Sequence, residues 1–563
     1  MKKIVGLILL VFLSFGVHAS HIMGGEITWE CIKDPLNPDV GKYIFTMKLY
    51  RDCDGISLPT TNQTLNVWNH PTVTTISLQF ISNTDISPDC DVTNSGNPAL
   101  DCFTNPVGAV EEYIYQSLPI ALIGAPPISN PPTPTTHGWH FTWDSCCRNG
   151  AIVNLTTPSS DGFTMRASMF AYVDPLGNST PTDPCFDSSP IFNESPKTII
   201  CTGYPFSYTH NASDQEMDSL VYSWDEPLDD FFGAYNPPVT PGLLTYTPPY
   251  TANNPLPGNP TLNPQNGQIS YTSNLSGNFV TVVRVDAYKC DQLVAQIYRE
   301  IQAVLIACPP LAGGNANLPP NIPAPFPAPT PYYTTVAAGT LVSFNISASD
   351  ADLYAAGIPQ DVSLEITGGQ MAGDFITTTD CVSPPCATFT DNLGNPPPFS
   401  SPSIVNGIFE WQTACTHIAS DAGCGNVSNI YNFAIKAYDD FCPANAITFA
   451  TITIEVTQAA SLPAPDLKCV FVNGNGDVTL DWNHTVGANN STLYHLYASD
   501  NIGGPYVNVA DVSYPTDNYT IDSSLVPPGA QYFFMTNEST CASESLPSDT
   551  ITPIALEISS NNV

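Results

Sequence analysis

Apolar and polar residues alternate along many short stretches of this chain, as half-buried β-strands require. Two of these stretches resemble each other, Phe279-Val-Thr-Val-Val-Arg-Val-Asp-Ala-Tyr288 and Tyr431-Asn-Phe-Ala-Ile-Lys-Ala-Tyr-Asp-Asp440. They lie about 150 residues apart, and an interval on that scale indicates a repeated unit. Each is followed by a second strand-like run, at 295–306 and at 447–456. The pattern predicts a pair of strands at the same place in two repeats.

Two further features precede each pair of strands in the same order. An Asn-Gly turn leads into a strand at 266–271 and at 406–411, and an acidic turn lies further upstream at 212–218 and at 348–352. Four matching features in one order predict two tandem β-sandwich modules.

Composition agrees with an all-β chain. The 563 residues have room for roughly three to five domains. The 55 prolines and 36 glycines separate many short runs rich in Val, Ile, Phe, Tyr and Trp, and no amphipathic helical stretch of useful length is present. We therefore expect tandem β-sandwich modules, stapled by disulfides, in an extended arrangement.

The charge is strongly acidic, with 51 acidic and 14 basic residues and a formal net charge of −37. A polyanion of this kind does not attract nucleic acid or an anionic membrane through its general field. Two readings remain open, namely solubility outside the cell and the binding of divalent cations.

The amino terminus has the pattern of a secretory signal. Met1-Lys-Lys supplies positive charge, 4–15 is an apolar run too short to span a bilayer, and Val17 and Ala19 are the small residues of a cleavage site before Ser20. No later segment is long enough for a transmembrane helix. We expect a chain that is secreted, to the extracellular space or the outer cell surface.

Seventeen cysteines in an exported chain predict disulfides before metal sites, and an odd total leaves one thiol unpaired or bonded to another chain. The simplest pairings join neighbours: Cys31 with Cys53, Cys90 with Cys102, Cys185 with Cys201, Cys290 with Cys308, and Cys469 with Cys541. The adjacent Cys146 and Cys147 should point to opposite faces of an extended segment and so have different partners. Further candidates lie in an insertion of the second repeat: Cys381, Cys386, Cys415 and Cys424.

Several motifs are similar to the amino-terminal region of large secreted surface proteins of Bacteroidota. They are His21-Ile-Met-Gly-Gly-Glu-Ile-Thr-Trp-Glu-Cys31, Lys48-Leu-Tyr-Arg-Asp-Cys53, Cys146-Cys-Arg-Asn149 and Tyr298-Arg-Glu-Ile-Gln302. Proteins of this family are described as gliding-motility-associated or PKD-domain proteins and usually end in a sorting module for type IX secretion, which the sequence does not show. The resemblance implies a surface location and says nothing of a chemistry.

The last part of the chain resembles a fibronectin type III domain. Val478, Leu480 and Trp482 alternate on one face, and the resemblance implies that Trp482 fills the core. The expected organisation is then a signal peptide (1–19), an N-terminal β domain (20–182), a PKD/cadherin-like sandwich (185–308), a Pro-rich linker (309–331), a second PKD/cadherin-like sandwich (332–458), a fibronectin type III-like module (462–554) and a tail (555–563).

Acidic residues in the two acidic turns are candidate calcium ligands. Carboxylates that alternate in a loop converge on one point, and calcium accepts six to eight oxygens from flexible loops. The candidates of the first repeat are Asp214, Glu216, Asp218 and Asp286, and those of the second are Asp350, Asp352, Asp439 and Asp440. The alternative is an ordinary acidic turn in which Asp closes its own backbone. Calcium is the one cofactor that we expect.

Catalysis finds little support in the sequence. His137-Gly-Trp-His140 offers only two local metal ligands, and the pairs Glu111-Glu112 and Asp229-Asp230 point apart on a strand, whereas glycosidase carboxylates must face each other. No nucleophile elbow, zinc-protease motif or phosphate-binding loop is present.

We therefore expect a non-catalytic surface adhesin or spacer protein, with a link to gliding or attachment implied by the resemblance alone. Two alternatives remain, a protein that binds extracellular polysaccharide and a subunit of a surface filament. The partner would be a polysaccharide, a surface protein or a second copy of the chain. Tyrosines among prolines, such as Tyr235 and Tyr246, fit either sugar stacking or stiffening of a loop.

Overall fold

The computed structural model describes residues 22–553, except for 175–176, 178–184, 312, 419–427, 459–461, 485–490 and 540–543. The expected signal peptide and tail, together with Cys424 and Cys541, lie outside the described residues. Within them nearly every regular element is a strand, and the helical ones are single turns: α2 (Val92–Ser95), η2 (Ala355–Gly357) and η3 (Cys415–His417). The all-β prediction is confirmed.

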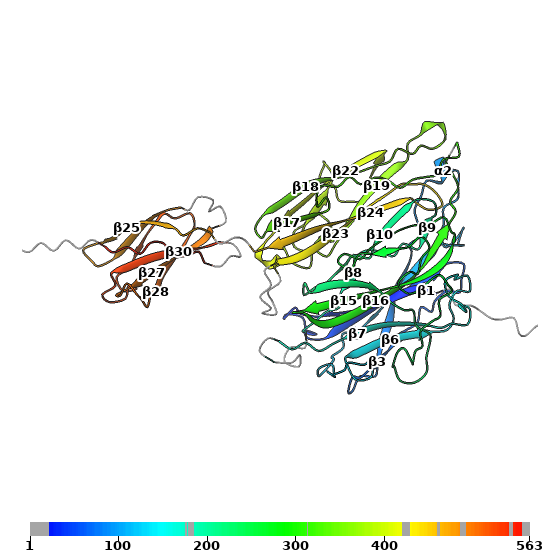
Figure 1. The fold of residues 1–563 in the computed structure, drawn as a ribbon, viewed down its shortest axis with the longest axis horizontal. Coiled ribbons are helices and arrows are strands. Elements are labelled where there is room, and N and C mark those ends of the chain that lie inside the picture. The colour runs from blue at the N-terminus through cyan, green and yellow to red at the C-terminus, as the bar shows by residue number, and fades with distance from the viewer. Residues whose placement is uncertain are drawn as a thin grey trace, which may run out of the picture.

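One 11-stranded sheet organises the first half of the chain (Figure 1). Its order is β1 (Ile22–Cys31), β2 (Tyr43–Asp52), β5 (Val110–Ser117), β4 (Thr75–Asp85), β3 (Gln63–Trp68), β6 (Trp139–Ser145), β7 (Phe163–Met169), β16 (Gln292–Ile306), β15 (Gly277–Lys289) and β12 (Ser219–Trp224), with β9 (Ile199–Cys201) also on β16. Because β7, β1 and β9 pair in turn with β16, the sheet curls back on itself.

This sheet joins two ranges that the sequence pattern separates, 20–182 and 185–308. Both contribute strands, and their apolar side chains pack into a single core in which Trp29, Phe45, Phe141 and Val285 are at most 1% exposed. Alternation of apolar and polar residues predicts where a strand lies and which of its faces is buried, as in β2. It does not predict which other strand pairs with the edge strand of a sheet. The first repeat is therefore not a free-standing module.

Two small sheets pack into the core of this unit. They are β10 (Pro205–Thr209), β14 (Gln268–Thr272) and β13 (Thr261–Leu262), and the pair β8 (Ile191–Phe192) and β11 (Ala212–Ser213). The turn expected at Asn266-Gly267 lies before β14, and Gly267 has a φ of +71°. The matching turn at Asn406-Gly407 does not form, because both residues lie inside a strand of the second repeat, from Ile404 to Gln412.

The second repeat is a two-layered sandwich. One layer has the order β17 (Tyr333–Ala337), β24 (Ile447–Thr457), β23 (Ser428–Tyr438), β19 (Asp361–Thr367) and β21 (Phe399–Pro402), and the other has β18 (Leu341–Ser349), β22 (Ile404–Gln412) and β20 (Thr388–Thr390). The paired strands that reveal the repeat form antiparallel hairpins in both units, β15 with β16 and β23 with β24.

The second sandwich packs directly on the first unit. Ala446, Ile447 and Phe449 belong to the core of the first unit, and the rings of Phe449 and Tyr208 lie 5.5 Å apart. The Pro-rich stretch 309–331 also packs inward, since Ile322 is buried in the second core. Residues 22–458 thus pack together, and the extended part of the arrangement is the C-terminal module, which stands apart in Figure 1.

That module consists of two three-stranded sheets, β25 (Asp466–Val472), β26 (Val478–Asn483) and β29 (Asn518–Ile521), and β28 (Val507–Ser513), β27 (Ser491–Ser499) and β30 (Tyr532–Ser539). The predicted face of Val478, Leu480 and Trp482 is buried, and Trp482 is 1% exposed. Among the described residues, no helix has the length and apolar character needed to cross a bilayer.

The motifs that carry the family resemblance are structural. Arg299 on β16 forms a buried ion pair with Glu26 on β1, and Arg148 of the Cys-Cys-Arg-Asn motif forms another with Glu300. Gly24 is required at this crossing, because a Cβ there would lie 1.9 Å from the carbonyl oxygen of Glu300. Three distant motifs therefore meet at the junction of β1 and β16.

The disulfides mostly join distant segments. The bonds are Cys31–Cys185, Cys53–Cys102, Cys90–Cys442, Cys146–Cys147, Cys201–Cys308 and Cys381–Cys386. Cys290 and Cys415 are also disulfide-bonded, and Cys469 is a free, exposed thiol. Cys442, which was not among the candidates, closes a separation of 352 residues with Cys90.

The expected pairings of neighbouring cysteines are therefore wrong. Cys31 cannot reach Cys53, because β1 and β2 pair with Cys31 opposite Tyr43, which leaves Cys53 at the other end of the hairpin. Cys147 has a φ of +114°, so the segment is not extended there and the two adjacent cysteines bond to each other. The other differences follow from the shared sheet, which places Cys53 beside Cys102 and Cys201 beside Cys308, and leaves Cys469 unpaired.

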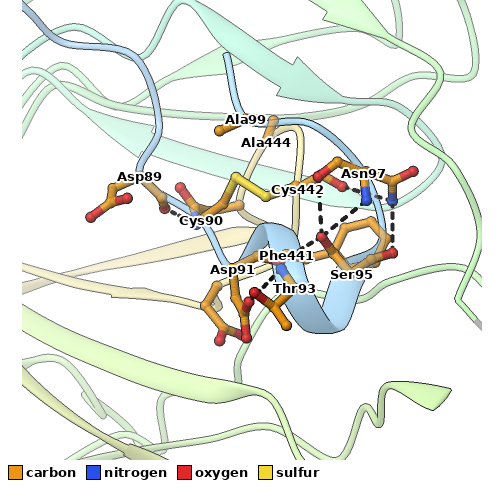
Figure 2. The surroundings of a disulfide bond; sticks show 12 residues. Asp89, Cys90, Asp91, Thr93, Ser95, Asn97, Ala99, Phe441, Cys442 and Ala444 are labelled. Carbon is orange, nitrogen blue, oxygen red and sulfur yellow. Dashed lines mark hydrogen bonds between the residues drawn. A yellow bond between two sulfur atoms is a disulfide. The ribbon is translucent and has the colours of Figure 1, made fainter. Parts of the chain in front are cut away.

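Figure 2 shows the bond between the two units. Cys90 comes directly before Asp91, which caps the amino terminus of α2 by accepting hydrogen bonds from the backbone N–H groups of Thr93 and Asn94. The backbone N–H of Asp91 donates to the carbonyl of Asp440 at 2.7 Å, and Asn97 Nδ2 donates to the carbonyl of Cys442 at 3.3 Å. The disulfide thus lies within a hydrogen-bonded contact.

Candidate metal centre and the adjoining cleft

The acidic turn of the first repeat is closed by one of its own carboxylates. Asp214 Oδ1 accepts hydrogen bonds from the backbone N–H groups of Glu216 at 2.9 Å and Asp218 at 3.1 Å, and Met217 adopts a φ of +61°. Part of Asp214 therefore acts as in any acidic turn. Its second oxygen, Oδ2, is buried and has no hydrogen-bond partner.

Another carboxylate, which the sequence pattern does not single out, lies opposite this turn. Asp187 is fully buried, and neither of its carboxylate oxygens has a hydrogen-bond partner. One oxygen from each of Asp187, Asp214 and Glu216 lies within 4.8 Å of the other two. We call Asp187, Asp214, Glu216 and Asp218 the acidic cluster.

The segment that carries Asp187 is fixed against β1. The backbone N–H of Ser189 donates to the carbonyl of Trp29 at 2.9 Å, and the backbone N–H of Cys31 donates to Ser188 Oγ at 3.1 Å. Cys185, two residues before Asp187, is bonded to Cys31. Asp187 could be placed near the acidic turn from sequence only if the Cys31–Cys185 pairing were known, and cysteine spacing does not indicate that pairing.

Two lysines contact the acidic cluster from different elements. Lys289, at the end of β15, donates to Asp218 Oδ1 at 3.0 Å, and Lys33, which follows β1, forms an ion pair with Glu216. Four carboxylates thus face two ammonium groups, which leaves two negative charges uncompensated when all the groups are ionised. The side chains of Glu216 and Asp218 are only 3% and 4% exposed, so water screens these charges little.

Burial and mutual repulsion shift the titration of these groups. Burial, followed by the charges of Glu216 and Asp214, raises the pKa of Asp187 well above its ordinary value. Burial and the neighbouring carboxylates also raise the pKa of Asp214. Burial opposes a charge on Lys289, but Asp218 and Asp187 outweigh it, so that the pKa of Lys289 is raised.

Asp286, expected to complete this set, does not join it. Its carboxylate accepts hydrogen bonds from Arg284 at 3.0 Å and from Gln296 Nε2 at 2.9 Å, on the face of β15 beside β12. Asp286 and Lys289 are three residues apart on β15, so their side chains lie on opposite faces of the sheet. The sequence shows this spacing but does not show which of the two faces the acidic turn.

The acidic residues of the second repeat are used in hydrogen bonds to loops. Asp439 is buried and accepts from Asn317 Nδ2 at 2.6 Å and from the backbone of Phe441 and Ala446, and burial raises its pKa. Asp440 accepts from the hydroxyl of Tyr354 at 2.8 Å. The other two, on the loop after β18, accept from backbone N–H groups: Asp350 from Asp352, and Asp352 from Leu318. Among the described residues, only the first repeat gathers three carboxylates at ligand distance.

A cleft of about 870 Å³ lies beside the acidic cluster, where the first unit meets the second sandwich. Asp214, Asp218 and Lys289 line one side of it. The remaining lining includes amide side chains and aromatic rings, namely Gln265, Gln370, Asn429, Asn432, Tyr288 and Tyr431.

The other chemical candidates are engaged elsewhere. His140 uses one ring nitrogen on Ser168 Oγ and the other on the carbonyl of His137, and burial lowers its pKa to about 4. Glu111 forms an ion pair with Arg51. The carboxylate of Asp229 accepts from the backbone of Gly162. These groups hold the fold together and do not converge on a common site.

Comparisons with known proteins give only distant likenesses. No protein-family model and no curated protein matches the chain. Among solved structures, domains A168–A170 of titin align at 14% identity over 65% of this chain and 99% of theirs, with a TM-score of 0.16. The FN1–FN3 domains of chicken CNTN1 align at 12% identity over 65% of this chain and 98% of theirs, also with a TM-score of 0.16. At that TM-score, neither likeness bears on the function of this chain.

Proposed function

We propose that this chain is a secreted, non-catalytic protein of the outer cell surface that acts as a structural or adhesive element. The observation that carries the proposal is the Cys90–Cys442 bond, which ties the two units together across 352 residues (Figure 2). Disulfides persist in oxidising surroundings outside the cytoplasm, and they preserve a fold where nothing refolds it. Such cross-linking suits a protein that must stay folded under load.

The bonds also set how far the chain can be stretched. The shortest covalent route from Cys31 to Cys442 passes through the Cys53–Cys102 and Cys90–Cys442 bonds and includes at most about 34 residues of backbone. At about 3.5 Å per residue, this region extends by no more than roughly 120 Å when oxidised. After reduction the same region can extend to roughly 1,400 Å.

Single-molecule stretching of the full chain between its ends tests the mechanical part. The proposal expects a short extension for the region up to Cys442 in oxidising buffer and the long one after reduction. A long extension in both buffers would show that the bonds do not carry load. Labelling of intact cells with antibodies against the folded chain tests the location, and labelling only after lysis would contradict it.

Polysaccharide binding is the second candidate, because the cleft presents amides beside tyrosine rings. Amide groups hydrogen-bond to sugar hydroxyls, and aromatic rings stack on sugar faces. Glycan-array binding by the full chain should be weakened by Gln265→Ala and Asn429→Ala but not by Asn475→Ala in the C-terminal module. Binding that all three variants retain equally would place the sugar site elsewhere.

A further inference from the structure

We infer that the acidic cluster of Asp187, Asp214, Glu216 and Asp218 binds one divalent cation, and that calcium is the ion that fits it best. This inference does not depend on the proposed function. It concerns four side chains that two separate segments, the acidic turn and the segment of Asp187, bring together beside the cleft.

The first observation is Asp187 itself. A buried carboxylate normally accepts hydrogen bonds, because burial without a partner strongly disfavours its charged form. Asp187 is 0% exposed, and both of its oxygens lack a hydrogen-bond donor, although one of them lies within 4.8 Å of oxygens of Asp214 and Glu216. A side chain placed in this way faces other carboxylates and forms neither an ion pair nor a hydrogen bond of its own with the described residues.

The second observation is the number of free ligand atoms. Six carboxylate oxygens of the acidic cluster are buried without a hydrogen-bond partner, and one of them, Glu216 Oε1, forms an ion pair with Lys33. Five oxygens remain without any contact to a donor or a cation: both oxygens of Asp187, Asp214 Oδ2, Glu216 Oε2 and Asp218 Oδ2. The other oxygens are already used, Asp214 Oδ1 by the turn, Glu216 Oε1 by Lys33 and Asp218 Oδ1 by Lys289. In each of Asp214, Glu216 and Asp218, one carboxylate oxygen therefore makes a fixed contact, and the other has no hydrogen-bond donor.

The third observation is charge. Lys33 and Lys289 neutralise two of the four carboxylates, and the two remaining negative charges match one divalent ion. The segments that carry the ligands are fixed independently, one by the Cys31–Cys185 bond and the other by the hydrogen bonds of the acidic turn. A cation would therefore bind to ligands whose positions are already fixed by the fold.

Ligand type selects among cations. Carboxylate oxygens suit magnesium, manganese and calcium, whereas zinc and copper favour nitrogen or sulfur. Magnesium usually keeps several of its waters, and full burial of Asp187 leaves little access for them. Calcium accepts six to eight oxygens in irregular geometry, which suits a set made from a turn and an opposing segment.

Calorimetry on the full chain after treatment with chelator tests the inference, with CaCl₂ as the titrant and MgCl₂ in parallel. We expect one calcium per chain, weaker magnesium binding and a rise in Tm with calcium. Asp187→Asn should weaken calcium binding at least tenfold. The matched control is Asp350→Asn, in the acidic turn of the second repeat, which should leave calcium affinity unchanged.

The same variant separates a cation site from a merely buried carboxylate. Because Asp187 has no hydrogen-bond donor to lose, Asp187→Asn should be at least as stable as the wild type without calcium and less stable than it with calcium. Glu216→Gln gives an independent second variant. No heat and no change in Tm for the wild type would overturn the inference, as would equal calcium affinity in the wild type and in both cluster variants.

Discussion

The buried ion pair of Glu26 and Arg299 should hold β1 against β16. Their side chains are 3% and 1% exposed, and Arg299 Nη2 donates to Glu26 Oε1 at 3.1 Å. Arg299 also donates to the carbonyl of Glu194 at 2.8 Å and to the hydroxyl of Tyr208 at 3.2 Å, and its guanidinium lies 3.9 Å from the ring centre of Phe192. This one side chain therefore links four elements of the first unit.

Arg299→Met keeps much of the side-chain volume but leaves the buried Glu26 carboxylate without its partner. We expect a loss of about 3–5 kcal/mol in the free energy of unfolding, the usual cost of breaking a buried pair from one side. Glu26→Gln keeps the shape and one acceptor, so we expect about 3 kcal/mol. The double variant should lose less than the sum of the two, by up to about 3 kcal/mol, because neither charge is then left alone.

Urea denaturation of the full, oxidised chain measures these differences, with the separate C-terminal module as an internal reference. Lys42→Met is the control, because Lys42 pairs with Asp39 at 2.6 Å on the surface, where both side chains are more than a third exposed. We expect that control to cost less than about 1 kcal/mol. Losses below about 1 kcal/mol in both single variants of the buried pair would refute the role assigned to it.

Three further predictions concern backbone packing, cross-linking and pH. Gly24→Ala should destabilise the first unit strongly, as a lower Tm, because its Cβ would lie 1.9 Å from a backbone oxygen; an unchanged Tm would contradict the crossing of β1 and β16. Cys90→Ala with Cys442→Ala should cost about 2–5 kcal/mol and let the second sandwich unfold separately, seen as an extra calorimetric transition. Burial raises the pKa of Asp350 from 3.8 to about 6, so the contribution of Asp350 to folding stability is present below about pH 4 and is lost as the pH rises through 6. The Tm of Asp350→Asn relative to the wild type should therefore rise between about pH 4 and 6. A difference in Tm that stays constant over this range would contradict the prediction.

Strands were predictable because alternation is a local property. The hairpins of β15 with β16 and β23 with β24, the buried face of β2 and the core position of Trp482 all follow from residues close in sequence. The partners of edge strands are not local. Nothing near β1 indicates that Gly24 would face Ile301, and so the boundary between the first two expected modules could not be judged from the pattern.

The candidate site was predictable only in part for the same reason. Spacing alone identified Asp214, Glu216 and Asp218, which belong to one turn. Asp187 and Lys33 reach that turn through the Cys31–Cys185 bond, and cysteine spacing favours nearer partners. The four carboxylates of the second repeat have a similar spacing, and in the structure they accept hydrogen bonds from loop residues.

The most direct test of the disulfide cross-links between distant segments is disulfide mapping by mass spectrometry on the purified, non-reduced chain. The structure predicts cross-linked peptides that carry Cys31 with Cys185 and Cys90 with Cys442, together with a free thiol at Cys469. Peptides that join Cys31 to Cys53 and Cys90 to Cys102, or reduced thiols throughout, would contradict it.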